Sequence, residues 1–233
     1  MIIYGRNPVR EALRGRRAGA VGDVWATAAA AREPWLASRR PRVVRAEEVH
    51  DRCGSTAHQG VCADAGAYPY VASHELLGGH PEPTLLALDS IQDPQNLGAL
   101  CRTAECSGVT GLAIPRHRAV EVTPAVCKAS AGAVEHLRIA LVRNLADFLG
   151  EAKKSGCWCY GASADAHVAY DAPDYRGGVV LVMGGEGKGL RPRVAAVCDE
   201  LVSVPLRGRI ESLNVSAAGA ILMYQVLQRK SRA

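Results

Sequence analysis

The sequence lacks several features that would assign it to large classes of protein. No stretch approaches the roughly 20 consecutive apolar residues of a membrane-spanning helix, so we expect no membrane partner. Residues 1–8 have neither the basic start nor the apolar core of a signal peptide, which favours a cytoplasmic location. The eight cysteines form no C-x-x-C pair and the seven histidines no ligand-like cluster, so we expect reduced thiols and no metal.

The glycine-rich segment at 184–189 lacks the common nucleotide-binding motifs. It follows an apolar run, but no Ser or Thr follows Lys188, which excludes a Walker A loop, and no frame reads G-x-G-x-x-G. Glycines still let a backbone approach a ligand closely. Glu186 could meet a cationic group, pair with an arginine or cap a helix. Taken alone, the segment is better explained as an unspecific glycine turn.

Positive charge is concentrated at the N-terminus. The formal net charge is +5; residues 1–60 hold 11 arginines against 6 acidic residues, whereas residues 61–233 hold 17 residues of each sign. Arginine binds phosphate through paired hydrogen bonds and stacks on bases. The first 60 residues are therefore a candidate nucleic-acid surface, the alternative being a solvated face in an arginine-rich protein.

The pattern of short apolar runs predicts two α/β parts. Residues 1–71 read as a small α/β unit, with a first helix at 8–13 capped by Asn7. Glycine and proline make 72–83 a candidate linker. From 84 to 233 short apolar strands alternate with helices, which predicts a mostly parallel sheet with helices on both faces.

Two strand-to-helix loops carry candidate functional residues. In the first, a helix is expected to begin near Asn96, and Arg102 is the only charged residue on its first two turns. In the second, a strand stops at Pro205 and a helix opens at Ser212 to Asn214. Unpaired N–H groups at such helix starts favour ligand binding. The alternatives are an arginine that ties two elements together and an ordinary helix cap.

Taken together, three motifs are specific. N-x-G-A-x-x-R-T-A, G-G-E-G-x-G and V-P-x-x-G-x-x-x-S-L-N-V-S occur in this order within roughly residues 84–229. In this combination the chain resembles the SpoU/TrmH-type RNA ribose 2′-O-methyltransferases of the SPOUT superfamily. Residues 4–13, 58–61 and 128–133 are similar to the subgroup that methylates a guanosine of 23S rRNA, in which a small domain binds the RNA.

The resemblance implies a fold, a reaction and site residues. The sheet at 84–233 would be trefoil-knotted, would form a homodimer, and would transfer a methyl group from S-adenosylmethionine to a ribose. Carried over residue by residue, the catalytic group is Arg102, Asn96, Glu186, Ser212 and Asn214. The cofactor-binding group is Gly184, Val204, Leu206 and Leu213.

Two alternatives remain open at this point. The same chemistry could act on tRNA or on another rRNA nucleoside. The chain could also be a non-catalytic RNA-binding assembly factor with the same fold, although the intact motifs argue against this.

Overall fold

The computed structural model describes residues 1–185, 187 and 189–231, which divide into two compact units. Unit 1 contains residues 1–69 together with 122–136, and unit 2 contains the rest of the chain. The chain therefore passes between the units three times, at residues 69–70, 121–122 and 136–137. The domain limits expected from the sequence, 1–71 and 84–233, remain a prediction. They do not include the return of residues 122–136 to unit 1.

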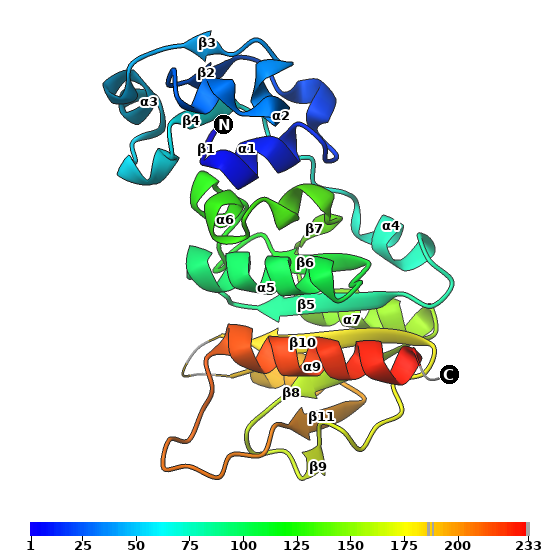
Figure 1. Cartoon of the computed structure of the whole chain (residues 1–233). Coiled ribbons are helices and arrows are strands. Elements are labelled where there is room, and N and C mark those ends of the chain that lie inside the picture. Colours follow the sequence, from blue (N-terminus) through cyan, green and yellow to red (C-terminus); the bar gives the residue numbers. More distant parts are fainter. Residues whose placement is uncertain (186, 188, 232–233) are drawn as a thin grey trace. The chain divides into compact units, whose positions relative to one another are not determined.

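Within its described residues, unit 1 is built on a four-stranded sheet in the order β1-β4-β2-β3 (Figure 1). Strand β4 is antiparallel to β1 and β2, and β3 is parallel to β2. The strands are β1 (Ile2–Tyr4), β2 (Val24–Ala26), β3 (Arg42–Val43) and β4 (Val61–Asp64). The helices from this part of the chain are α1 (Arg6–Ala12), α2 (Pro34–Ala37) and α3 (Ala46–Cys53), with short 3-10 turns η1 (Ala18–Ala20), η2 (Ala30–Arg32) and η3 (Thr56–His58).

The start of α1 differs from the sequence-based expectation. Asn7 does not cap it, because the helix already begins at Arg6 and the cap position is Gly5. Gly5 has φ 96°, a conformation that residues with a side chain rarely adopt. The backbone turn at Gly5, rather than a side-chain cap, therefore starts the helix.

The returning segment completes unit 1. It forms α6 (Pro124–Ala129) and the 3-10 turn η4 (Ala133–His136). The two elements do not form one continuous helix because Ala131 and Gly132, which lie between them, both have positive φ. The Tyr68 hydroxyl donates to the Val134 carbonyl at 2.8 Å, which fastens the segment to the end of the N-terminal stretch.

In the described part of unit 2, a seven-stranded sheet runs in the order β7-β6-β5-β10-β8-β11-β9, with every pairing parallel. Its strands are β5 (Thr84–Asp89), β6 (Gly111–Pro115), β7 (Ile139–Val142), β8 (Cys157–Ala162), β9 (Val168–Ala169), β10 (Gly178–Gly184) and β11 (Glu200–Ser203). The helices are α4 (Ser73–Gly78), α5 (Pro94–Cys106), α7 (Leu145–Lys154), α8 (Pro192–Ala195) and α9 (Val215–Lys230).

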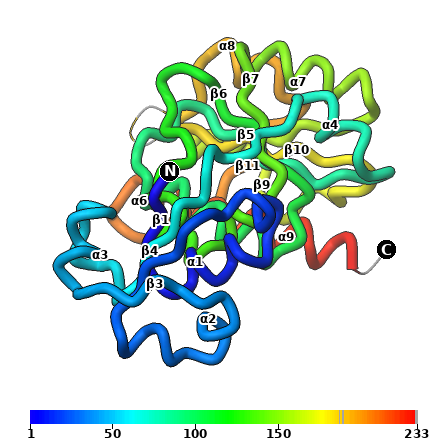
Figure 2. Tube along the Cα trace, turned by 90° about the horizontal axis from the view of Figure 1, so that it is seen from above, coloured from blue at the N-terminus to red at the C-terminus, as the bar shows by residue number. Residues whose placement is uncertain are grey.

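Helices cover both faces of this sheet, as the apolar strand pattern predicted. Figure 2 shows α7 and α8 on one side of the strands and α9 on the other. One face packs residues such as Leu85, Ala87 and Val180 against Leu145 and Phe148 of α7. On the other face α9 packs against α5, and a side-chain carbon at Gly219 would lie 2.5 Å from Leu100. The core of unit 2 therefore lies in two layers around the central strands β5, β10 and β8.

The segment expected as a linker contains helix α4. Glu75 accepts a hydrogen bond from the Ala72 backbone at 2.9 Å, and Leu76 is buried against the sheet beside Gly111. This one apolar contact and one cap were too short a pattern to indicate a helix from the sequence. No helix within the described residues is long and apolar enough to cross a membrane.

Candidate active site

The site lies at the point in the unit 2 sheet where the order of successive strands reverses. From β5 the chain continues to β6 on one side, and from β10 it continues through α8 to β11 on the other side. In open parallel sheets, ligands bind outside the carboxyl ends of the strands at such a switch point. Asp89 ends β5 and pairs in register with Gly184, which ends β10, so the loops that follow these residues meet at this edge.

Asn96 and Asn214 meet at this edge. Asn96 lies in the first turn of α5 and is 6 % exposed, and Asn214 is the N-cap of α9. The side-chain oxygen of Asn214, Oδ1, accepts a hydrogen bond from the Ser216 backbone N–H at 2.8 Å, which fixes the orientation of the Asn214 side-chain amide. The amide nitrogen then donates to Asn96 Oδ1 at 3.0 Å. Two of the predicted catalytic residues, 118 positions apart, are thus directly hydrogen-bonded.

Arg102 lies on α5, six residues after Asn96, and its side chain is exposed. At 1.5 Å per residue, six residues correspond to roughly 9 Å along the helix axis. The small and apolar residues around Arg102 are buried in the contact between α5 and the rest of unit 2, whereas its guanidinium remains accessible to a ligand. It is therefore an accessible cation on the helix that carries Asn96.

The glycine loop is folded back on itself. Gly185 and Gly189 form an antiparallel bridge, and the Gly189 N–H donates to the Gly185 carbonyl at 3.1 Å. A side-chain carbon at Gly184 would overlap the Gly189 backbone, and one at Gly185 would lie 2.8 Å from the Ser90 carbonyl oxygen. This close backbone packing explains the glycines at 184 and 185. Glu186 and Lys188 lie outside the described residues.

A buried carboxylate that sequence reasoning missed anchors this loop. Asp89 is fully buried; its Oδ2 accepts from the Arg191 backbone at 2.8 Å and its Oδ1 from Arg191 Nε at 2.6 Å. The sequence signal that could have identified Asp89 is its place directly after the apolar run at 84–88. A carboxylate buried at the end of such a strand requires a hydrogen-bonding or charged partner. Asp89 and Arg191 thus hold the end of the glycine loop against the end of β5.

The remaining predicted residues lie on the segment between β11 and α9. Val204 is half-buried directly after β11, whereas Leu206, Ser212 and Leu213 are exposed. The cofactor-binding and catalytic roles of these three exposed residues therefore remain predictions. Their backbone lies on the connection that leads into Asn214.

Four thiols of the chain lie in surroundings that make them poor nucleophiles. Burial raises the pKa of both Cys127 and Cys159 to about 12, and that of Cys62 and Cys198 to about 11. A thiol with such a pKa is almost entirely protonated at neutral pH. These four cysteines are therefore packing residues rather than reactive ones.

Comparison with known proteins agrees with the three motifs. The model of the SpoU rRNA Methylase family matches residues 83–224, and that of the RNA 2′-O ribose methyltransferase substrate-binding domain matches residues 2–71. The chain belongs to the SpoU rRNA methylase family. This membership confirms the predicted family and its activity class, RNA 2′-O-ribose methyltransferase.

Relatives from bacteria resemble most of the chain. The 23S rRNA (guanosine-2′-O-)-methyltransferase RlmB of Xanthomonas campestris pv. campestris is 40 % identical over 181 residues, 76 % of this chain and 73 % of that protein. YacO of Bacillus subtilis, assigned to the TrmH family of tRNA/rRNA methyltransferases, is 42 % identical over 178 residues, 75 % of this chain and 72 % of that protein. Both relatives therefore cover nearly the same share of this chain.

The fold also matches solved structures of this class. The SpoU methyltransferase AviRb of Streptomyces viridochromogenes, crystallised with AdoMet, superposes with a TM-score of 0.82 over 99 % of this chain and 90 % of AviRb, at 19 % identity. The predicted fold class, a parallel sheet with helices on both faces preceded by a small α/β unit, is confirmed. The trefoil knot remains a prediction.

Proposed function

We propose that this protein transfers the methyl group of S-adenosylmethionine to the 2′-hydroxyl of a guanosine in 23S rRNA. The observation that carries the proposal is the Asn96–Asn214 hydrogen bond beside the glycine loop, since it brings the first and third motifs together at the switch point of the sheet. The 40 % identity to a 23S rRNA guanosine methyltransferase supports the choice of substrate.

The glycine loop fits a bound cofactor. Side-chain carbons at Gly187 and Gly189 would meet no described atom within 4 Å, so the loop offers bare backbone and open space beside it. Together with this loop, the residues that would hold the cofactor are Gly184, Val204, Leu206 and Leu213. S-Adenosylmethionine would supply an activated methyl group, so no metal is required for the transfer.

The protein's own residues must position the hydroxyl and stabilise its developing negative charge. Arg102 is suited to the second task, because an arginine guanidinium carries a delocalised positive charge and several fixed hydrogen-bond donors. Asn96 and Asn214, fixed against one another, would orient the ribose or the adjacent phosphate. Ser212 and Glu186 complete the proposed catalytic group.

A homodimer formed through unit 2 is part of the proposal. Ile210 is 76 % exposed and Tyr224 is 45 % exposed, the first on the segment before α9 and the second on α9 itself. We take these two side chains as candidates for the contact, since burial of exposed apolar surface favours association. A second copy of this chain would cover them through a symmetric contact.

The experiment that tests this proposal identifies the methylated nucleoside and its position in the RNA. The purified protein is incubated with methyl-labelled S-adenosylmethionine and protein-free 23S rRNA, and the label is mapped by nuclease digestion and mass spectrometry. We expect one 2′-O-methylguanosine, lost with Arg102→Ala and retained with Glu105→Ala, an exposed neighbour on α5. Label on tRNA alone, or cofactor binding without transfer to any RNA, would contradict the proposal.

A further inference from the structure

The carboxyl edge of the unit 2 sheet contains a second site, which shares Arg191 with the anchor of the glycine loop. It is a cleft of about 830 Å³ at the ends of β6 and β7. Its lining combines three segments: the loop after Pro115, the start of α7, and the stretch that follows the glycine loop. Besides His117, its lining holds the charged residues Arg118, Arg143, Asp147, Arg191 and Arg193.

The cleft is strongly cationic. Among the described lining residues, Asp147 is the only carboxylate, and it pairs with Arg193 at 3.2 Å. Arg191 is held by the buried Asp89. Arg118 and Arg143 are exposed and come from different loops. Since residues 61–233 carry equal numbers of basic and acidic residues, this cluster is a local excess of positive charge rather than part of a basic unit.

The framework under these arginines is rigid. Pro115 pairs in register with Val142, and the Arg116 N–H donates to the Val142 carbonyl at 2.9 Å, which fixes the loop that carries Arg118 beside the residue before Arg143. Asn144 caps α7 through its bond to the Ala146 N–H at 3.0 Å. The cations are therefore held on the ends of ordered strands.

We propose that this cleft binds backbone phosphates of the RNA substrate. This inference rests on the proposed function, since it takes RNA as the polyanion. Guanidinium groups bind phosphate through two parallel hydrogen bonds, and several arginines spread over three segments suit a chain of phosphates better than a single anion. The cleft would thus provide an RNA-binding surface on unit 2, in addition to the RNA-binding surface expected on unit 1.

The test measures RNA binding without cofactor, so that it does not depend on methyl transfer. A fluorescein-labelled RNA hairpin is titrated with the full chain and with Arg118→Gln/Arg143→Gln at several salt concentrations. The control, Lys154→Gln/Arg176→Gln, removes two exposed charges from the opposite, amino-terminal edge of the same sheet. Unchanged melting temperatures show that both variants fold.

We expect the cleft variant to lose roughly 25-fold in affinity at 0.1 M salt, and the slope of log K against log salt to become less negative by about 1.4, or about 0.7 for each lost phosphate. The control should keep the wild-type slope, and both variants should keep the wild-type affinity for S-adenosylmethionine. A wild-type slope in the cleft variant would overturn the inference.

Two further outcomes would also overturn it. Weaker S-adenosylmethionine binding in the cleft variant would assign these arginines to the cofactor. Stabilisation of the wild-type protein by inorganic phosphate alone, lost in the variant while its RNA slope is unchanged, would indicate a site for a free anion. Failure of the proposed function itself appears separately, as absence of methyl transfer by a wild-type protein that binds RNA.

Discussion

At the scale of single residues, Asn214 has two separable roles. Its side-chain Oδ1 caps α9 by accepting from the Ser216 N–H, and its side-chain Nδ2 donates to Asn96 Oδ1. The cap is a local interaction that many Asn residues make at helix starts. The second bond joins the first turn of α5 to the start of α9, 118 residues later in the sequence. This is the bond that would matter for catalysis.

Asn214→Asp separates these roles. The carboxylate still accepts from the Ser216 N–H and suits the positive end of a helix, so the contribution of the cap to stability is kept. It cannot donate to Asn96 Oδ1, and a carboxylate oxygen would instead face that carbonyl oxygen. Because such a mismatch costs about 1–3 kcal/mol, we expect kcat to fall roughly tenfold or more. Asn214→Ala, which removes both bonds, should also lower the stability by about 1 kcal/mol. Methylation kinetics and thermal melts measure both effects; wild-type kcat in Asn214→Asp would show that the pair has no catalytic role.

The sequence identified Asn96 and Asn214 separately, because each stands at a strand-to-helix transition with a recognisable pattern. It could not show that they are bonded, since pairing between distant loops depends on how α5 and α9 pack. Asp89 was missed for a related reason. Its function depends on Arg191, 102 residues later, and neither residue is unusual within its own segment.

At the scale of elements, the parallel sheet was predictable and the exceptions have physical causes. Strands such as β5 and β10 are almost entirely buried, so they read as continuous apolar runs. Helix α5 carries Pro94 in its first turn and an Asp93 cap, both common helix-start signals. The start of α1 was misplaced because a backbone conformation at Gly5 replaces a side-chain cap. Nothing local indicated that 122–136 belongs with unit 1.

The glycine loop gives a prediction at this scale. Asp89→Asn keeps the side-chain volume, but the amide would place at least one N–H against a donor of Arg191. The loop end would then be released from β5, and we expect the dissociation constant for S-adenosylmethionine to rise roughly tenfold, with a smaller change in kcat at saturating cofactor. Arg191→Gln, which keeps the backbone bond, should have an intermediate effect.

Calorimetric titration of the cofactor measures this effect directly. Asp174→Asn is the matched control, because the Asp174 side chain is 64 % exposed and lies before β10, away from the loop. If Asp89→Asn folds and binds the cofactor as the wild type does, the Asp89–Arg191 pair is structural only.

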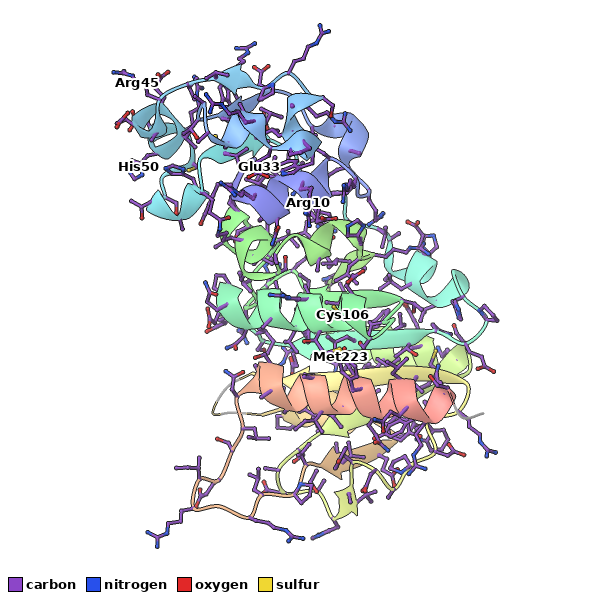
Figure 3. All side chains as sticks on the ribbon, in the orientation of Figure 1. Arg10, Glu33, Arg45, His50, Cys106 and Met223 are labelled. Carbon is purple, nitrogen blue, oxygen red and sulfur yellow. The ribbon has the colours of Figure 1, made fainter. Side chains whose placement is uncertain are left out.

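At the scale of the whole molecule, the three chain passages change how unit 1 should be studied. Truncation before residue 70 would remove the N-terminal part of unit 1 but leave 122–136 attached to unit 2. Buried side chains such as Val126 and Val134 would be uncovered, and Glu135 would lose its partner. A loss of activity in such a truncation would mix misfolding with loss of RNA binding. Charge substitutions on exposed arginines of the full chain, such as Arg45 (Figure 3), which is 81 % exposed, avoid this problem.

A buried ion pair between Arg17 and Glu135 also joins the two parts of unit 1. The guanidinium donates to both carboxylate oxygens, at 2.6 and 2.7 Å, and both side chains are buried. Tyr68 lies against the guanidinium, with the Arg17 Cζ 5.6 Å from the ring centroid. Burial alone would lower the pKa of Arg17, but the hydrogen bonds and charge of Glu135 raise it, so Arg17 stays a cation.

Glu135→Gln would leave the Arg17 charge buried without a counter-charge. Removing one partner of a buried pair costs about 3–5 kcal/mol, so we expect the urea midpoint of unit 1 to fall by the corresponding amount. Asp23→Asn, which breaks the exposed Arg42–Asp23 pair in the same unit, should change the stability by less than about 1 kcal/mol. The double variant Arg17→Met/Glu135→Met, which buries no charge, should recover most of the loss. If Glu135→Gln were as stable as Asp23→Asn, packing of 122–136 rather than the ion pair would hold the two parts of unit 1 together.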